Sequence, residues 1–218
     1  MTAAVELDEA TWKARLDAGV HELGLDLDQS QLDTLWRYAH MLRERNAHVN
    51  LTSIVSPEGI LTLHMLDSLS VAPHLGDARR IIDVGTGGGF PGIPLAVAFP
   101  DRHFTLIDGT QKKIRFVAES IAALDIRNVT AIAARAESYG GERNFDVVVA
   151  RAVGSLADLV RDASGLLAPR GRLLAMKGKL ADEELRAVPR GWRTEAIALR
   201  VPGLDAERHL VTLSRRSA

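Results

Sequence analysis

Apolar residues recur at helical spacing through the first part of the chain and outline two amphipathic helices. The two stripes are Trp12, Leu16, Val20 and Leu23, and then Leu32, Leu35, Trp36, Ala39 and Leu42. Residues 30–33, Ser-Gln-Leu-Asp, predict a variant capping box at the start of the second helix. A third helix is expected from about residue 56 to residue 70, because Ser56 can cap it and Pro57 suits its first position.

The pattern changes after residue 75, where short apolar runs alternate with segments of helix-forming composition. The runs are 80–84, 103–108, 129–133, 145–150 and 171–176, and the helical segments include 111–124 and 155–167. This alternation predicts a parallel sheet with helices on both faces. Two further runs, 194–201 and 209–214, predict an antiparallel hairpin at the sheet edge. The expected organisation is a helical extension over residues 1–75 and an α/β domain over residues 76–218.

A glycine-rich loop follows the first predicted strand and opens a helix: Asp83-Val84-Gly85-Thr86-Gly87-Gly88-Gly89-Phe90-Pro91-Gly92. Five glycines in so short a window favour a ligand close to the main chain over a turn that holds nothing. A GxGxxG frame is present but is weak by itself. Pro91 and Pro94 each remove an amide donor that a pyrophosphate would use. Asp83 suits the ammonium group of an amino-acid-bearing cofactor, directly or through water, and acid–x–Gly–x–Gly after a strand is the S-adenosylmethionine (SAM) pattern.

Two further strand ends carry groups that suit a nucleoside. Asp108 ends the second strand and could accept hydrogen bonds from both ribose hydroxyls. It could equally cap the helix that follows Gly109. Arg135-Ala136-Glu137 follows the third strand and could contact an adenine ring, although taken alone it would be an ordinary solvated turn.

Composition and charge narrow the chemistry. The 218 residues include no cysteine, which excludes disulfides, thiolate metal sites and a cysteine nucleophile, and the histidines show no metal-ligand spacing. Residues 1–75 hold 5 Lys/Arg against 11 Asp/Glu, whereas residues 76–218 hold 22 Lys/Arg against 17 Asp/Glu. A polyanionic partner would therefore bind to the part of the chain after residue 75. The first residues lack the apolar segment of a secretory signal, and no run approaches a membrane span, so a cytoplasmic enzyme is expected.

Several strings taken together closely resemble the RsmG/GidB family of bacterial ribosomal RNA small subunit methyltransferases. They are Asn50-Leu51-Thr52-Ser53, His64-Met65-Leu66-Asp67-Ser68, Ile82-Asp83-Val84-Gly85-Thr86-Gly87, Phe90-Pro91-Gly92-Ile93-Pro94, Arg151-Ala152, Met176-Lys177-Gly178 and Glu207-Arg208-His209-Leu210. The resemblance covers nearly the whole chain. Two departures are Gly88, where many relatives carry proline, and Gly109, where a serine would be expected.

The resemblance implies a class I SAM-methyltransferase, Rossmann-like fold with a mostly parallel seven-stranded sheet. It implies transfer of a methyl group from SAM to N7 of one guanine in a 16S rRNA loop near the decoding site. The implied cofactor-binding residues are Gly85, Phe90, Ala136, Glu137 and Arg151, to which the loop and strand-end arguments add Gly87 and Asp108. The expected partner is 16S rRNA or the small ribosomal subunit, with no metal and no membrane, and the protein is expected to be a monomer.

The chemistry of N7 methylation fits this residue inventory. N7 of guanine has a free lone pair and no proton to lose, so the reaction needs alignment and desolvation but no general base. Pyrimidine C5 methylation would need a cysteine. Exocyclic amines commonly need an Asn/Asp-Pro-Pro-aromatic string, whereas this chain has Ala150-Arg151-Ala152 after the fourth strand. No acid or base is therefore assigned, and Arg151 is expected to position the reactants.

The candidate RNA contacts are polar and basic residues near strand ends or in the family strings: Asn50, His64, Lys112, Lys113, Arg115, Arg135, Lys177, Lys179 and Arg208. Each basic residue alone is better explained as a solvated surface charge, and an isolated His64 as packing. Two other functions stay open. One is a SAM-dependent methyltransferase of a small molecule, which would bind its substrate without strong salt dependence. The other is a non-catalytic nucleotide-binding module that holds NAD in the same loop.

Overall fold

The computed structural model describes residues 7–152 and 154–216. The first part contains helices α1 (Glu9–Glu22), α2 (Gln29–Asn46), α3 (Pro57–Gly59) and α4 (Asp67–Leu69), with the π-helix η1 (Ile60–Leu66) and the 3-10 turn η2 (Ala72–His74). The strands are β1 (Arg80–Val84), β2 (His103–Asp108), β3 (Val129–Ala133), β4 (Phe145–Arg151), β5 (Leu167–Lys177), β6 (Trp192–Ala198) and β7 (His209–Arg215). Between them lie α5 (Gly92–Ala98), α6 (Gln111–Ala123), η3 (Ala136–Ser138), α7 (Leu156–Ala163), η4 (Ser164–Leu166) and α8 (Asp182–Arg186).

The seven strands form one sheet in the order β3-β2-β1-β4-β5-β7-β6. Strands β1 to β5 pair in parallel, whereas β7 pairs antiparallel with both β5 and β6. The α/β fold and the antiparallel edge hairpin predicted from the sequence are therefore confirmed. The strand order reverses between β1 and β4, because β2 and β3 lie on one side of β1 whereas β4 and β5 lie on the other. Doubly wound sheets bind their ligands at such a point, outside the carboxyl ends of the parallel strands.

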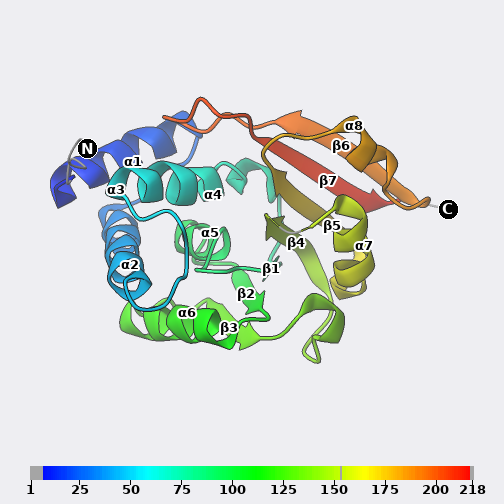
Figure 1. The fold of residues 1–218 in the computed structure, drawn as a ribbon, viewed down its shortest axis with the longest axis horizontal. Helices are drawn as coiled ribbons and strands as arrows, with labels where there is room; N and C mark the ends of the chain where they lie inside the picture. Colours follow the sequence, from blue (N-terminus) through cyan, green and yellow to red (C-terminus); the bar gives the residue numbers. More distant parts are fainter. Residues whose placement is uncertain (1–6, 153, 217–218) are drawn as a thin grey trace.

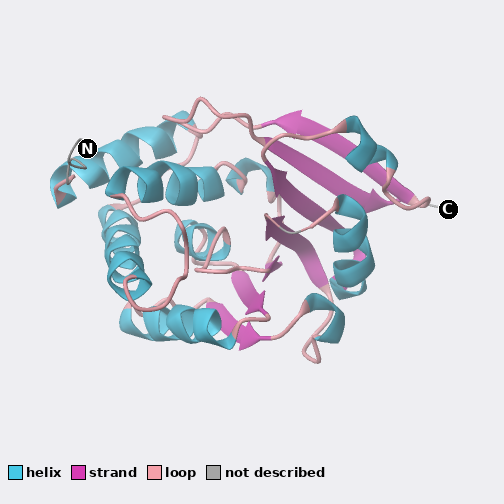
Figure 2. Cartoon of the chain, viewed as in Figure 1, coloured by secondary structure: helices cyan, strands magenta, loops and turns pink. Residues whose placement is uncertain are grey.

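Helices cover both faces of this sheet (Figures 1 and 2). Helices α1, α2, α4, α5 and α6 lie on one side, and α7 and α8 lie on the other. Side chains alternate across the strands accordingly, so that Ile81 and Val147 face the first layer while Ile82 and Val148 face the second. Fully buried Trp12 belongs to the same core cluster as Ile81, so the N-terminal helices and the sheet share one hydrophobic core.

Two local predictions for the N-terminal helices need correction. The second helix is capped by Asp28, not by Ser30: its carboxylate accepts from the amide of Gln31, and the Gln31 side chain accepts from the Asp28 amide. The third helix does begin at Ser56, whose hydroxyl accepts from the Gly59 amide. Seven of its residues, Ile60–Leu66, nevertheless wind as a π-helix, a form that is frequent at functional sites.

Candidate functional site

A cavity of about 590 Å³ opens at the carboxyl ends of β1, β2 and β3. Its lining includes Gly85, Asp108, Lys113, Arg135, Ala136 and Glu137. A larger cavity of about 710 Å³ lies at the opposite edge of the sheet, where Val97, His103 and Asn128 line it. The smaller cavity is the better candidate, because ligands of doubly wound sheets bind outside the carboxyl ends of the strands.

The glycine loop is held in a conformation that ordinary side chains rarely adopt. Gly85, Gly87 and Gly89 have φ angles of +72°, +59° and +90°, in the left-handed region. A side chain of the first helical layer braces the loop, since the Tyr38 hydroxyl donates to the Gly88 carbonyl at 2.6 Å. Tyr38 is fully buried, so the N-terminal extension contributes directly to the shape of the loop.

Asp83 stabilises the glycine loop through hydrogen bonds and does not line the cavity. One carboxylate oxygen accepts from the Thr86 hydroxyl at 2.6 Å and from the Gly92 amide at 2.8 Å. The other oxygen has no partner among the described residues. Burial raises the pKa of Asp83 to about 6, although both of those hydrogen bonds lower it. Because Asp83 is completely buried, the expected direct contact with a cofactor ammonium group is absent from this geometry, and the contact through water stays a prediction.

Asp108 lines the cavity and links two backbone segments. One oxygen accepts from the Gly87 amide at 3.0 Å and the other accepts from the Thr110 amide at 2.7 Å. Thr110 is the N-cap of α6, so Asp108 supports the helix start without being its cap. Each carboxylate oxygen retains acceptor capacity, which suits the ribose hydroxyls expected from the sequence.

The other cofactor-binding candidates fall into three groups. Ala136 and Glu137 lie in η3 and line the same cavity as Gly85. Phe90 is almost fully buried and, like Gly87, is not part of the cavity lining. Arg151, at the end of β4, lines a second cavity of about 470 Å³.

The second cavity brings together residues from distant parts of the sequence, including Ile54, His64, Asp67, Arg151, Lys177 and Arg208. The connection that follows β4 joins the two cavities, since Ala152 lines the second and Gly154 lines the first. The two cavities therefore approach each other at the carboxyl end of β4.

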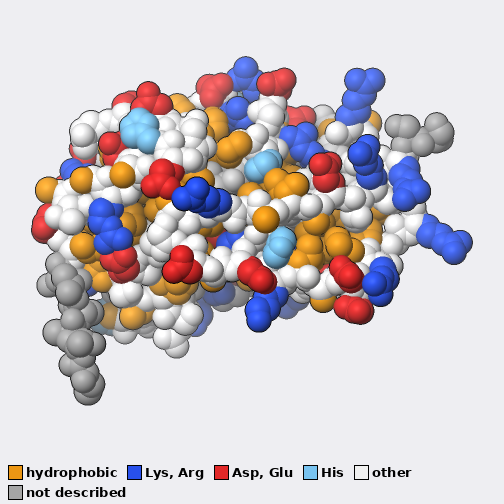
Figure 3. All heavy atoms as spheres, turned by 90° about the horizontal axis from the view of Figure 1, so that it is seen from above, with side chains coloured by type: hydrophobic (Ala, Val, Ile, Leu, Met, Phe, Trp, Pro, Cys, Tyr) orange, Lys and Arg blue, Asp and Glu red, His pale blue; other side chains and the backbone are white. Residues whose placement is uncertain are grey.

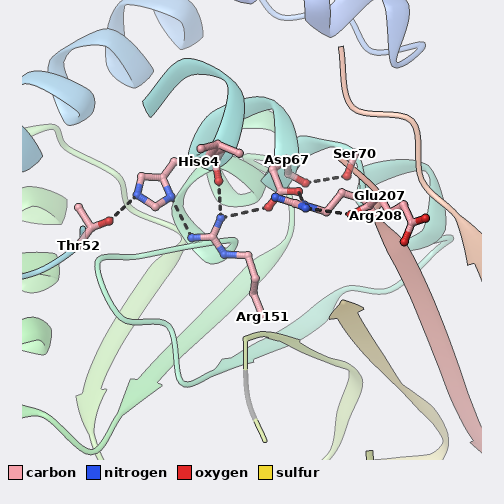
Figure 4. A network of polar contacts seen from close by, with 8 residues as sticks. Thr52, His64, Asp67, Ser70, Arg151, Glu207 and Arg208 are labelled. Atoms are coloured by element: carbon pink, nitrogen blue, oxygen red, sulfur yellow. Dashed lines mark hydrogen bonds and ion pairs between the residues drawn. The ribbon is translucent and has the colours of Figure 1, made fainter. Parts of the chain in front are cut away.

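A buried ionic network forms one wall of the second cavity (Figure 4). Asp67 accepts from Arg151 Nη1 at 3.2 Å and from Arg208 Nε at 2.9 Å, with its own side chain only 4% exposed. Arg151 Nη1 also donates to the Leu63 carbonyl at 2.8 Å. Burial lowers the pKa of Arg151, and Asp67 opposes this effect, so the guanidinium stays charged. Three of the five N–H groups of Arg151 thus have partners in the network once its Nη2 bond to His64 is included.

His64 lies in the middle of the network in its neutral form. Its ring contacts Thr52 Oγ1 at 2.9 Å and Arg151 Nη2 at 3.1 Å, and stacks on Phe90 with a centroid separation of 4.2 Å. Burial, with the positive charge of Arg151, lowers the pKa of His64 to about 3. Thr52 and Asp67 lie in strings that carry the family resemblance, but the sequence alone assigns neither residue a role. The i, i+3 spacing of His64 and Asp67 on one helix was the available signal.

The candidate RNA contacts are spread over the surface around the two cavities. Asn50 is exposed in the connection between α2 and α3, and Lys112 is exposed on the first turn of α6. Lys113 and Arg135 lie at the mouth of the first cavity, whereas Arg208 is held by Asp67. Figure 3 shows Lys and Arg side chains, with acidic ones interspersed, at the end of the molecule near the C-terminal strands.

Residues 7–152 and 154–216 contain neither a membrane-spanning helix nor a group of metal ligands. No helix there is both long and apolar enough to cross a membrane. Those residues also contain no group of three or more His, Asp or Glu side chains that could hold a metal ion.

Comparison with known proteins decides the family. Residues 31–211 match the family model described as rRNA small subunit methyltransferase G (GidB). This chain belongs to that family. A relative named ribosomal RNA small subunit methyltransferase G from Methylococcus capsulatus is 46% identical over 198 residues, which cover 91% of this chain and 96% of the relative. One of the same name from Nitrosococcus oceani is 43% identical over 204 residues, or 93% and 95% of the two chains.

Solved structures support the fold independently. The crystal structure of a methyltransferase from Geobacter sulfurreducens has a TM-score of 0.58 with this GidB-family chain, covering 93% of this chain and 98% of that one. Its sequence identity is 15%, so the likeness concerns the fold alone. The class I, Rossmann-like methyltransferase fold predicted from the sequence is confirmed.

Proposed function

We propose that this protein transfers a methyl group from SAM to N7 of a guanine in a loop of 16S rRNA. The observation that carries the proposal is the pair of adjacent cavities at the carboxyl ends of the strands, joined by the connection after β4, in a GidB-family chain. The first cavity is the proposed cofactor site and the second is the proposed site of the guanine base.

The residues of the first cavity fit a nucleoside cofactor. SAM supplies an electrophilic methyl group on a sulfonium centre when it is bound. Asp108 offers carboxylate oxygens to the ribose hydroxyls, Ala136 and Glu137 lie where an adenine ring could contact them, and Gly85 lets the ligand approach the main chain closely. The cavity volume of about 590 Å³ lies within the range of about 300–1,000 Å³ that is usual for ligand pockets.

Arg151 is the proposed positioning residue between the two sites. Its Nε–H and its second Nη2–H have no acceptor among the described residues. Two neighbouring N–H donors of a guanidinium match a carboxylate, so we assign them to the methionine carboxylate of the cofactor. The guanidinium would thereby fix the methionine end of the cofactor beside the second cavity.

The residues of the second cavity suit a reaction that needs no proton transfer. N7 of guanine carries a lone pair at neutral pH and releases no proton on methylation. The pKa of His64 is about 3, which makes its ring a weak proton acceptor at neutral pH, and Arg151 is permanently charged, so neither is poised as a general base. Alignment of the base and exclusion of water are what the site must provide, and orientation can contribute on the order of 7–11 kcal/mol.

The RNA itself would be held outside the cavities. N7 lies in the deep, narrow major groove of A-form RNA, so the guanine must come from a loop or be turned out of its stack. Lys112, Lys113, Arg135 and Arg208, together with Asn50, are the proposed contacts to the RNA. We expect the protein to act as a cytoplasmic monomer on 16S rRNA or on the small subunit.

Gly87→Val tests the proposal. The left-handed φ of Gly87 strains any side chain, and the Gly87 amide donates one of the two hydrogen bonds that hold Asp108. Gly191→Val is the matched control, because Gly191 has a φ of +98°, has open space around it and lies far along the chain from the cavity. We expect Gly87→Val to abolish SAM binding in calorimetry, while Gly191→Val binds SAM as the unsubstituted protein does.

The RNA product is measured in the same experiment. Mass-spectrometric mapping of N7-methylguanosine in 16S rRNA should detect one modified guanine with the unsubstituted protein and none with Gly87→Val. Unchanged SAM affinity in Gly87→Val would contradict the cofactor site. Methylation of a small molecule, with substrate binding insensitive to salt, would contradict the RNA substrate.

A further inference from the structure

Thr52 and His64 form a contact that the proposed reaction has not used. Thr52 lies in the connection between α2 and α3, and His64 lies in the π-helix η1. The imidazole lies between two polar partners, with Nε2 at 2.9 Å from Thr52 Oγ1 and Nδ1 at 3.1 Å from Arg151 Nη2 (Figure 4). Both ring nitrogens of a buried histidine are therefore occupied.

The protons on these groups can be assigned from chemistry alone. A guanidinium only donates, so Nδ1 of His64 must present its lone pair to Arg151. The single proton of the neutral ring is then on Nε2, and Thr52 Oγ1 accepts it. Thr52 Oγ1 also accepts from the Ile54 amide at 3.0 Å, which fills both of its lone pairs. Arg151 therefore determines which tautomer His64 adopts, and Thr52 Oγ1 supplies the acceptor for the Nε2–H of that tautomer.

Hydrogen bonds from Asn46 fix the backbone around Thr52 and thereby the position of its hydroxyl. Asn46, at the end of α2, accepts from the Leu51 and Thr52 amides at 2.7 and 2.9 Å. Its side-chain amide donates to the Thr52 carbonyl at 3.0 Å. Three hydrogen bonds that involve the half-buried Asn46 side chain therefore hold the Thr52 hydroxyl within hydrogen-bonding distance of His64.

Stacking connects the same imidazole to the glycine loop. His64 and the Phe90 ring are nearly parallel, with an interplanar angle of 8°. Arg151 Cζ lies 5.3 Å from the centre of the Phe90 ring. His64 therefore contacts both Arg151 and Phe90 of the glycine loop, so the position of the guanidinium is linked to that loop.

We propose that Thr52 and His64 are positioning residues for methyl transfer: Thr52 accepts from Nε2–H of His64, and Nδ1 of His64 accepts from Arg151, so the pair orients the Arg151 guanidinium between the two cavities. The inference rests on the proposed function for its kinetic consequence but not for its geometry. Among the described residues, Arg151 is the charged group that contacts the ring directly, and Asp67 of α4 pairs with Arg151. His64 stays neutral and exchanges no proton during the reaction.

Thr52→Val and Thr52→Ser test the proposal as a matched pair. Valine keeps the shape of threonine but removes the acceptor, so the ring either buries an unpaired N–H or turns to the tautomer that places a proton against Arg151. Serine keeps the acceptor. We expect Thr52→Val to lower kcat on 16S rRNA at least about tenfold, since small misplacements of reacting groups can cost about a hundredfold. Thr52→Ser should restore kcat to within about threefold of the unsubstituted protein.

Substitutions at His64 separate positioning from proton transfer. The Asn side chain can place an oxygen near the position of Nδ1, whereas Gln reaches the position of Nε2. His64→Asn should therefore lose less kcat than His64→Gln. The dependence of kcat on pH between 5 and 8 should be the same shape in His64→Asn as in the unsubstituted protein. A new or lost titration in that range would overturn the positioning role.

Nitrogen-15 NMR tests the tautomer of His64 and its hydrogen bond with Arg151 without requiring catalysis. The unsubstituted protein should show His64 protonated at Nε2, and Thr52→Val should shift the Arg151 Nε–H resonance while the urea midpoint shows that the variant is folded. Protonation at Nδ1 in the unsubstituted protein, or an unmoved Arg151 resonance together with unchanged kcat in Thr52→Val, would refute the inference. Absence of N7-methylguanosine with the unsubstituted protein would instead refute the proposed function, and the NMR result would still decide the geometry.

Discussion

Asp67 is the residue whose loss should disturb this site most. It accepts from Arg151 at 3.2 Å and from Arg208 at 2.9 Å, and these contacts join α4, β4 and the segment before β7. Asp67→Asn keeps the size of the side chain but removes its negative charge. Two guanidinium groups would then face each other without the carboxylate between them.

The size of the expected loss of stability follows from the burial of the Asp67 ion pairs. Removing one partner of a buried ion pair costs about 3–5 kcal/mol, because the remaining charge is left unpaired. The side chains of Arg151 and Arg208 are 18% and 22% exposed, so water compensates part of that loss. We therefore expect Asp67→Asn to lower the free energy of unfolding by about 2–4 kcal/mol. A tenfold or greater fall in kcat should accompany it, since Arg151 loses its orientation.

Urea denaturation followed by fluorescence or circular dichroism measures this change. Asp101→Asn is the matched control, because Asp101 pairs with Arg79 at 2.7 Å on the surface, where their side chains are 63% and 68% exposed. Exposed pairs contribute at most about 1 kcal/mol, and the control should change by no more than that. If the two variants lost the same small amount of stability, the account of Asp67 as the centre of a buried network would be refuted.

Two further predictions concern the glycine loop. Tyr38→Phe leaves the Gly88 carbonyl without its buried donor, so the free energy of unfolding should fall by about 1–3 kcal/mol and SAM affinity should weaken, as calorimetry can measure; unchanged values of both would show that α2 does not brace the loop. Asp83 has a pKa of about 6 in the folded protein against 3.8 for an ordinary carboxyl, so the folded state binds more protons and its stability falls as pH rises from about 4 to 6. Asp83→Asn removes that loss, and its stability relative to the unsubstituted protein should increase by about 3 kcal/mol over this range in urea titrations; a pH-independent difference would contradict the assignment.

The sheet was predictable because its strands are apolar on both faces. The runs at residues 80–84, 103–108 and 129–133 coincide with β1, β2 and β3. The glycine loop and Asp108 were also found at the predicted edge, since spacing along a strand determines where its end lies. Asp28 replaced Ser30 as the helix cap because Gln31 pairs with it reciprocally.

The second cavity could not be built from the sequence. Asp67 and Arg208 are 141 positions apart, and only the folded chain shows that they share an ion pair. Nor does any sequence period predict the stacking of His64 on Phe90, because it depends on how a π-helix packs on a loop. The family strings indicated which residues mattered, and the fold indicated which of them touch.

The N-terminal extension has a specific part in this architecture. Tyr38 of α2 holds the glycine loop, and Asn46 at the end of the same helix holds Thr52. The extension also supplies His64 and Asp67, which hydrogen-bond to Arg151. The acidic first part of the chain therefore shapes both cavities, while the more basic second part offers candidate contacts to RNA.

The central claim is that the cavity at the carboxyl ends of β1, β2 and β3 holds the methyl donor. A crystal structure with S-adenosylhomocysteine tests it most directly. We predict density for the nucleoside between Gly85, Asp108 and Ala136, with its amino-acid end toward Arg151. Density in the 710 Å³ cavity at the opposite edge of the sheet, or none in either cavity at saturating ligand, would contradict the account.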